Sequence, residues 1–224
     1  MSAIFIRFIN RLVPHLPKSF PEGSSSWVLQ TFFERLLREN RHIAAIAETG
    51  FNTGVSSRAF LSARPDTTVV SFDIGDHPWV RSRKAAIDHS FPRRHELVLG
   101  DSRDTLRAYA AKHPGTRFDL VFIDGGHEYD VARADLLNFR AMSHDHTVVV
   151  MDDLTPWLEW GRGPSRAWHE ALQAGLVVQE GLYQNGQPVK EPTGRRFQRI
   201  WALGRYCELQ LTSFPDFHSE GVRR

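Results

Sequence analysis

Short runs of Val, Ile and Phe alternate with longer stretches of helical periodicity through the middle of the chain, and no other sequence feature limits the fold as strongly. Runs that are apolar at every position predict strands buried on both faces, as in a parallel sheet covered by helices on each side. The pattern therefore predicts an α/β fold with a Rossmann-like, doubly wound, mostly parallel seven-stranded sheet. The expected strands cover residues 43–47, 68–72, 96–99, 120–123, 147–151, 176–183 and 197–203.

The segments outside the strands complete this outline. The last two strands follow one another across a Gly-, Pro- and Asn-rich connection, which predicts an antiparallel terminal strand. Before the first strand, an apolar segment at 4–13, a Pro- and Gly-rich linker and a helix capped by Ser26 predict a helical start. We therefore expect an N-terminal helical extension or lid at 1–40 and one domain at 41–224. The remaining expected helices cover residues 56–62, 80–89, 105–112, 131–142 and 165–174.

The composition argues against several classes of function. The 28 basic and 26 acidic residues nearly balance, so no nucleic-acid surface is expected. No apolar run approaches the ~20 residues of a membrane span, and Arg7 and Arg11 interrupt the apolar start too often for a secretion signal. The single cysteine, Cys207, allows no intramolecular disulfide. We expect a cytoplasmic protein, with a homodimer through the N-terminal helices as one option.

The first three strands each end in a loop suited to a ligand, because ligands of open parallel sheets bind beyond the carboxyl ends of the strands. Glu48 ends the first strand, and Gly50 with a second glycine lets the following loop approach a ligand closely. These glycines do not form G-x-G-x-x-G, which argues against an NAD enzyme. Asp73 ends the second strand, where a carboxylate can accept both ribose hydroxyls. Asp101 and Ser102 follow the third strand and can contact an adenine edge, cap the next helix, or do both.

Acidic residues also follow the fourth and fifth strands. Asp124 precedes His127 by three residues, and Asp152 and Asp153 end the neighbouring strand. Three carboxylates at adjacent strand ends repel one another and need a counter-ion, for which Mg²⁺ with oxygen ligands is the first candidate. The alternative is that each aspartate is a turn or cap residue of its own loop. We expect a metal site at Asp124, Asp152 and Asp153.

Five segments in this order carry a resemblance to a known family: AETGFNTGVSS, VVSFDIGDHP, LVLGDSRDTL, FDLVFIDGGHEYDVARADL and VVVMDDL. Together they resemble the class I S-adenosylmethionine-dependent methyltransferases, specifically the methyltransferase family 24 group. They are similar to macrocin-type and catechol-type O-methyltransferases. The resemblance implies S-adenosylmethionine as the cofactor. The positions that it assigns to cofactor binding are Glu48, Gly50, Asn52, Thr53, Ser56, Asp73, Ile74, Asp101, Ser102 and Asp124.

The resemblance and the acidic strand ends together predict metal-assisted O-methylation of a small-molecule hydroxyl on a sugar, a phenol or a natural product. Mg²⁺ would lower the pKa of the hydroxyl, with Asp124 and His127 as the catalytic residues and His127 taking the proton. The alternative for His127 is a turn residue. A mobile lid is expected at 155–163, which holds two tryptophans and two glycines. The rival functions are a metal-dependent hydroxylase on the same scaffold, an RNA or protein methyltransferase, and a cofactor-binding domain without catalysis.

Overall fold

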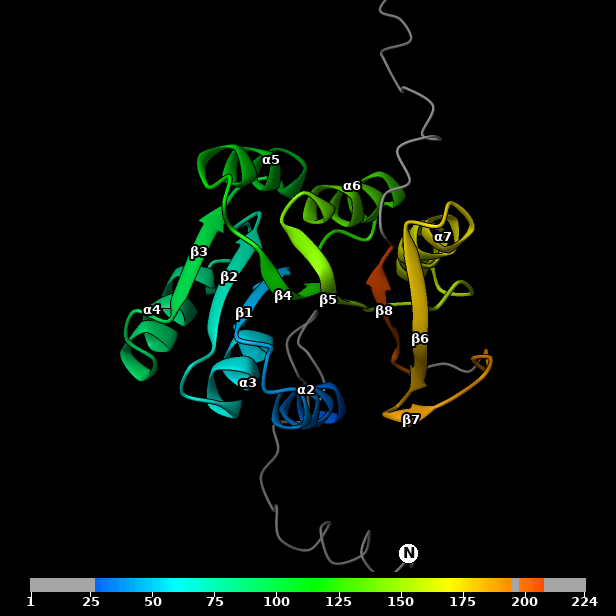
Figure 1. Ribbon diagram of the computed structural model, residues 1–224, viewed down its shortest axis with the longest axis horizontal. Helices are drawn as coiled ribbons and strands as arrows, with labels where there is room; N and C mark the ends of the chain where they lie inside the picture. The colour runs from blue at the N-terminus through cyan, green and yellow to red at the C-terminus, as the bar shows by residue number, and fades with distance from the viewer. Residues whose placement is uncertain (1–26, 195–197, 208–224) are drawn as a thin grey trace, which may run out of the picture.

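The computed structural model describes residues 27–194 and 198–207 of the chain. These residues form one eight-stranded sheet with helices on both faces (Figure 1). The strands are β1 Ala45–Thr49, β2 Thr68–Asp73, β3 His95–Leu99, β4 Phe118–Ile123, β5 Ser143–Met151, β6 Val177–Gln184, β7 Gln187–Pro188 and β8 Ile200–Tyr206. Their order across the sheet is β3-β2-β1-β4-β5-β8-β6-β7.

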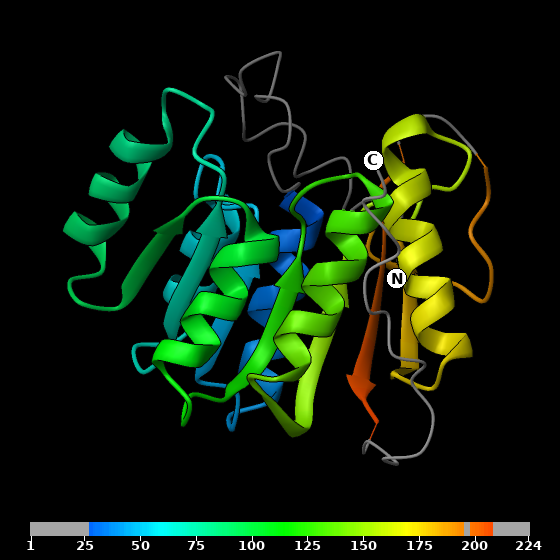
Figure 2. The same cartoon turned by 90° about the horizontal axis from the view of Figure 1, so that it is seen from above.

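The sheet is parallel from β3 to β5 and ends antiparallel, as predicted. β8 runs antiparallel to both β5 and β6, and its arrow points opposite to those of the parallel strands in Figure 2. The chain leaves β1 for β2 and β3 and then returns to β4 on the other side of β1. Such a switch point opens a ligand crevice at the carboxyl ends of the strands.

The eighth strand is the one difference from the predicted seven. β7 has two residues and pairs with the end of β6. The turn between them, Asn185 at φ 50° and Gly186 at φ 82°, has both central residues in the left-handed region. This is the backbone that an Asn-Gly pair favours in a tight hairpin.

The helices form two layers. They are α2 Trp27–Glu39, α3 Val55–Ala63, α4 Val80–Ser90, α5 Ser102–Lys112, α6 Tyr129–Arg140 and α7 Glu159–Gln173. One face of the sheet carries α2, α3 and α4, and the other carries α5, α6 and α7 (Figures 1 and 2). Among the described residues, no helix is both long and apolar enough to cross a membrane.

The side chains of β4 show why the central strands are apolar at every position. Leu120 and Phe122 point into the core under α2 and α3, whereas Val121 and Ile123 point into the core under α6 and α7. All four are nearly or fully buried. A strand between two helical layers has no solvent-facing side, so polar residues are confined to its ends.

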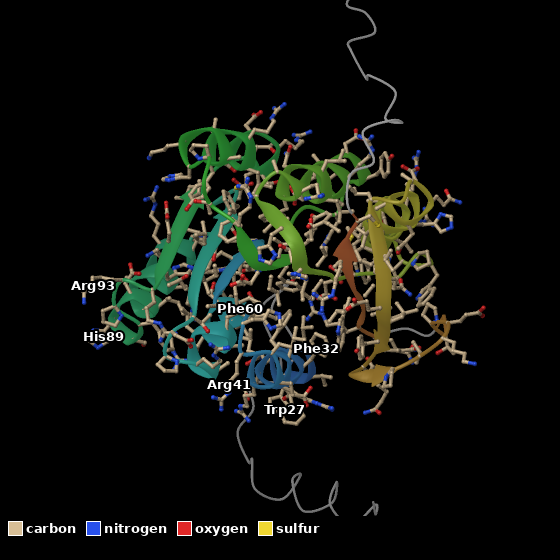
Figure 3. All side chains as sticks on the ribbon, in the orientation of Figure 1. Trp27, Phe32, Arg41, Phe60, His89 and Arg93 are labelled. Carbon is tan, nitrogen blue, oxygen red and sulfur yellow. The ribbon has the colours of Figure 1, made fainter. Side chains whose placement is uncertain are left out.

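Helix α2 packs on the same sheet. Its Phe32 ring lies 4.9 Å from Tyr183 and 5.3 Å from Trp201, centroid to centroid. In Figure 3 Phe32 lies on the side of α2 toward the sheet, while Trp27 points away from it and is 66% exposed. The predicted division at residue 40 stays a prediction, and the predicted helix at 4–13 lies outside the described residues.

Helix α7 begins at Glu159 rather than at the predicted residue 165, so part of the expected lid is its first turn. Gly161 and Gly163 suggest a loop by composition, but close packing explains them. A Cβ on Gly161 would lie 2.0 Å from Thr155 Oγ1, and one on Gly163 would lie 2.1 Å from the His127 carbonyl oxygen. Because the glycines have no Cβ, α7 packs directly against these loops at the carboxyl ends of β4 and β5.

Candidate functional site

A cavity of about 980 Å³ lies at the carboxyl ends of the parallel strands, where the switch point of the sheet predicts a ligand. It is bordered by loops that follow β1, β2, β3, β4 and β5, so it joins the two groups of polar residues expected from the sequence. The predicted residues that line it are Gly50, Asn52, Asp73, Ile74, Asp101, Ser102, Asp124, His127 and Asp153.

Asp73 is held by backbone donors on the wall of this cavity. Its carboxylate accepts the N–H of Asn52 at 2.8 Å and the N–H of Gly75 at 2.7 Å, one on each oxygen. The Asn52 side-chain oxygen accepts in turn from Trp79 Nε1 at 2.7 Å. Each carboxylate oxygen keeps acceptor capacity. A fixed carboxylate of this kind fits a pair of hydroxyl donors, as on a ribose.

Gly50 is the point at which the loops after β1 and β4 touch. Its backbone is left-handed, with φ 87°, and a Cβ there would lie 1.9 Å from the Asp124 carbonyl oxygen. The Gly50 N–H donates to the Phe72 carbonyl at 2.9 Å. No other residue type combines this backbone with so close an approach. The glycine therefore allows two loops to meet at the cavity, and its predicted approach to a ligand stays a prediction.

Asp101 caps a helix and also lines the cavity, while its contact with an adenine edge stays a prediction. It is the N-cap of α5 and accepts the Arg103 N–H at 2.9 Å. The Arg103 guanidinium pairs with it at 2.6 Å, and this contact holds the pKa of Asp101 below its ordinary value. Asp101 and Ser102 also line the cavity. Capping and ligand contact are thus compatible at this strand end.

Three of the residues assigned to the cofactor, Glu48, Thr53 and Ser56, are not among those lining the cavity. Glu48 is completely buried below the loop, where its Oε1 accepts from Ser57 and, at 2.7 Å, from Ser71. Burial raises the pKa of Glu48, and hydrogen bonds from the serines, Ser56 included, oppose that rise. In this arrangement Glu48 supports the loop from beneath. Direct contact with a cofactor stays a prediction for these residues.

His127 lines the other end of the cavity and contacts one of the paired acids. Its Nε2 lies 3.0 Å from Asp153 Oδ2, and this hydrogen bond raises the pKa of His127. Asp153 has a left-handed backbone, φ 59°, and its N–H donates to Asp152 Oδ1 at 2.8 Å. A histidine oriented by a carboxylate is the usual arrangement of a general base.

Asp124 and Asp152 lie deeper, with side chains that are 9% and 0% exposed. Burial, and then the charge of neighbouring aspartates, raises the pKa of both carboxyls. Arg199, which directly precedes β8, opposes that rise. Its Nε lies 2.9 Å from Asp152 Oδ2 and its Nη2 lies 3.9 Å from Asp124 Oδ2. The acids of two parallel strands are therefore paired with a cation from the antiparallel end of the sheet.

This geometry does not fit the predicted Mg²⁺ site at Asp124, Asp152 and Asp153. Within residues 27–194 and 198–207, no group of three His, Cys, Asp or Glu side chains is arranged to hold a metal ion. The guanidinium of Arg199 instead lies against two of the three carboxylates. The prediction that these acids need a counter-ion agrees with the structure, but its assignment to a metal is not supported.

Other residues at the cavity were missed in the sequence. Arg199 and Trp160 both line it. Asp135, on α6, is completely buried under Gly125, and burial raises its pKa to about 6. The sequence indicated only that the acids need a positively charged partner. It did not indicate where along the chain that partner lies.

Part of the chain matches a known family of protein domains. Residues 47–154 match the model of methyltransferase family 24, described as a methyltransferase domain. Among curated proteins, none matches the chain by sequence. The fold is similar to that of TomG from Streptomyces achromogenes, an O-methyltransferase of tomaymycin synthesis solved with S-adenosylmethionine. The TM-score is 0.67 at 19% identity, covering 92% of this chain and 96% of that one.

Two further structures agree. The Podospora anserina methyltransferase PaMTH1, bound to S-adenosylhomocysteine, has a TM-score of 0.65 at 16% identity over 92% of this chain and 94% of that one. CalS11, a TDP-rhamnose 3′-O-methyltransferase of calicheamicin biosynthesis, has a TM-score of 0.58 at 21% identity over 79% of this chain and 77% of that one. Residues 47–154 thus match a methyltransferase domain, and the chain shares the fold of methyltransferases solved with S-adenosylmethionine or S-adenosylhomocysteine, with a cavity at the strand ends.

Proposed function

We propose that this chain transfers the methyl group of S-adenosylmethionine to a hydroxyl oxygen of a small molecule. The observation that carries the proposal is that one continuous cavity is lined both by Asp73 and by the His127–Asp153 pair. One end offers acceptors for a nucleoside, and the other offers a base for a hydroxyl. Relatives of similar fold that are named as O-methyltransferases support the oxygen acceptor.

The residues of the first three strand ends suit the cofactor. Asp73 would accept the ribose hydroxyls, while Ile74, 61% exposed at the rim, would cover an apolar face of the adenine. Asp101 and Ser102 would contact the adenine edge. Gly50 and Asn52 also line the cavity and would lie beside the methionine part. When bound, S-adenosylmethionine supplies a methyl group that is attached to a positively charged sulfur. The sulfur is the leaving group and becomes a neutral thioether.

The chain itself contributes position and proton transfer. His127 accepts the proton of the acceptor hydroxyl as the oxygen bonds to the methyl carbon and the bonding pair of the old carbon–sulfur bond returns to sulfur. Because Nε2 faces Asp153, Nδ1 is the atom for this proton. Asp153 stabilises the imidazolium that results. Asp124 borders the reacting end of the cavity.

Mg²⁺ assistance is left out of this proposal, because the Arg199 ion pairs do not fit a metal among these acids. A homodimer through the N-terminal helices and a cytoplasmic location stay predictions from the sequence.

The proposal is tested by incubating the protein with S-adenosylmethionine and a panel of acceptors: a nucleoside-diphosphate sugar, a catechol and a glycosylated natural product. We expect release of S-adenosylhomocysteine with one acceptor class and a product heavier by one methylene group. A product heavier by one oxygen would instead establish the hydroxylase alternative. Cofactor turnover with RNA or protein but with no small molecule would contradict the proposal.

His127→Ala tests the base. With the acceptor identified in that panel, turnover is expected to fall on the order of 100-fold while cofactor affinity stays within about twofold, since a general base contributes to the chemical step. The matched control is His89→Ala on α4, an exposed histidine at the far edge of the molecule in Figure 3. Turnover of His127→Ala equal to that of the control would remove His127 from the mechanism.

A further inference from the structure

Two buried carboxylates lie beside each other at the reacting end of the cavity, where their negative charges repel one another. Asp124 and Asp152 are removed from water, and each charge disfavours the other. An acceptor oxygen that loses its proton here would add a third negative charge. Without a cation, the site would oppose the deprotonation that O-methylation needs.

Arg199 is positioned to supply that cation. Its side chain is 19% exposed, pairs with both acids and lines the cavity. Burial lowers the pKa of the guanidinium, but the charges of the acids together outweigh burial and raise it, so the guanidinium stays protonated at every relevant pH. A guanidinium has five N–H donors in a fixed plane, so it can hold carboxylates on one side and an acceptor oxygen on another.

The backbone around Arg199 fixes this placement. The Arg199 N–H donates to Asn185 Oδ1 at 3.0 Å, and the Asn185 N–H donates to the Arg199 carbonyl at 2.9 Å. Asn185 is the first residue of the left-handed Asn-Gly turn between β6 and β7. The hairpin at the antiparallel end of the sheet thus anchors the cation of the active site.

A metal ion would need oxygens from several of these acids around one point at about 2.0–2.6 Å. The described residues offer no such group, and a guanidinium against the same oxygens repels a second cation. We infer that Arg199 takes the place of a divalent metal in this enzyme, pairing with Asp124 and Asp152 and donating to the acceptor oxygen as its proton leaves. This inference rests on the proposed methyl transfer and makes that transfer independent of metal.

The test measures thermal unfolding in EDTA and in MgCl₂ or MnCl₂ alone. The wild-type melting temperature should differ by less than about 1 °C between these conditions, because a ligand that does not bind cannot stabilise. Arg199→Gln should melt about 10 °C lower in EDTA, since one charge pair is broken in the buried cluster. Mg²⁺ or Mn²⁺ should restore part of that loss, because the freed carboxylates can then take a cation.

Two further variants keep the test decisive. Arg199→Lys retains the charge and should melt closer to the wild type, with no metal response. Arg205→Gln is the matched control: Arg205 lies on β8, which begins directly after Arg199, and it pairs with Glu180 at 2.7 Å on the surface. It should change the melting temperature by less than about 2 °C, with no metal response.

The inference is overturned if Mg²⁺ or Mn²⁺ stabilises the wild type with saturation below about 1 mM and Asp152→Asn abolishes the effect. It is also overturned if EDTA abolishes wild-type turnover or if Arg199→Gln melts like the Arg205→Gln control. None of these unfolding measurements needs S-adenosylmethionine. A protein that passes them but binds no S-adenosylmethionine in calorimetry would contradict the proposed function alone.

Discussion

The acidic residues on the two sides of the cavity find their hydrogen-bond and ion-pair partners in different ways. On the β1–β3 side, the loops after β1, β2 and β3, each acid finds its partners within or beside its own loop: Asp73 on backbone N–H groups and Asp101 on Arg103. On the β4–β5 side, the loops after β4 and β5, Asp124 and Asp152 share a guanidinium from the start of β8. Locally satisfied acids remain in contact with water, whereas the shared cluster is almost dry.

The comparison separates two kinds of binding site. A carboxylate held by backbone donors is a preformed acceptor and needs no further charge. A buried group of carboxylates works only with its cation in place, so it depends on a distant part of the chain folding correctly. We therefore expect changes on the β1–β3 side to alter cofactor affinity, and changes on the β4–β5 side to alter stability and chemistry together.

Gly50→Ala should have the largest effect, because Gly50 joins the two sides. Its Cβ would overlap the Asp124 carbonyl, and its left-handed backbone adds strain. We expect a loss of about 4 kcal/mol or more in unfolding free energy, measured by urea denaturation, and no measurable cofactor binding. The control Gly115→Ala has no atom within 4 Å of its Cβ and should stay within about 0.5 kcal/mol of the wild type. Equal behaviour of the two variants would contradict the close contact.

Asp73→Ala should separate affinity from stability. Charge-assisted hydrogen bonds contribute about 1.5–3 kcal/mol each, so S-adenosylmethionine should bind about 100-fold more weakly by calorimetry. Asp76→Ala, an exposed acid in the same loop, serves as the control and should bind as the wild type does. If both variants kept full affinity, Asp73 would have no role in holding the ribose.

Asp135→Asn should stabilise the protein at neutral pH. Asp135 has a folded-state pKa of about 6, above its ordinary 3.8, so the folded state binds more protons between these values and stability falls as pH rises. At pH 7.5 the full cost, up to about 3 kcal/mol, is present in the wild type and absent from the variant.

Denaturation at pH 7.5 and at pH 4 measures the difference. The advantage of Asp135→Asn should shrink towards zero at the lower pH, whereas the exposed Asp145→Asn should show none at either. A variant less stable than the wild type at pH 7.5 would mean that the charge of Asp135 is needed by the fold.

Asp101→Asn should have the smallest effect on stability and on cofactor binding of the changes on the β1–β3 side. Asparagine still caps α5, and the Arg103 pair that is lost is half exposed. We expect at most about 1 kcal/mol of lost stability and less than about tenfold weaker cofactor binding. A loss as large as that of Asp73→Ala would show that Asp101 is as central to the cofactor as Asp73.

The parts of the fold that depend on local pattern were predictable from the sequence. The parallel strands, the helices between them and the antiparallel end all follow from runs of apolar residues and their spacing. The lid expected at 155–163 differs because composition does not distinguish a loop glycine from a helical glycine packed against Thr155 or His127.

The residues of the site were likewise predictable only where they follow from the local sequence pattern. Asp73, Asp101 and His127 line the cavity, as expected for residues at or shortly after the ends of strands, and their roles stay predictions. Arg199 was missed because it lies in a basic run beyond two further strands, and only tertiary contact brings it to the acids. Glu48 was assigned to the cofactor by resemblance, whereas its side chain turns beneath the loop toward Ser71.

The most direct test of the account is calorimetry of S-adenosylmethionine with the wild type and with Asp73→Ala, each in EDTA and in MgCl₂. We predict one-to-one binding by the wild type, equal in both buffers, and about 100-fold weaker binding by the variant. Absence of binding by the wild type in both buffers, or equal affinity of the two proteins, would contradict a cofactor held at this end of the sheet.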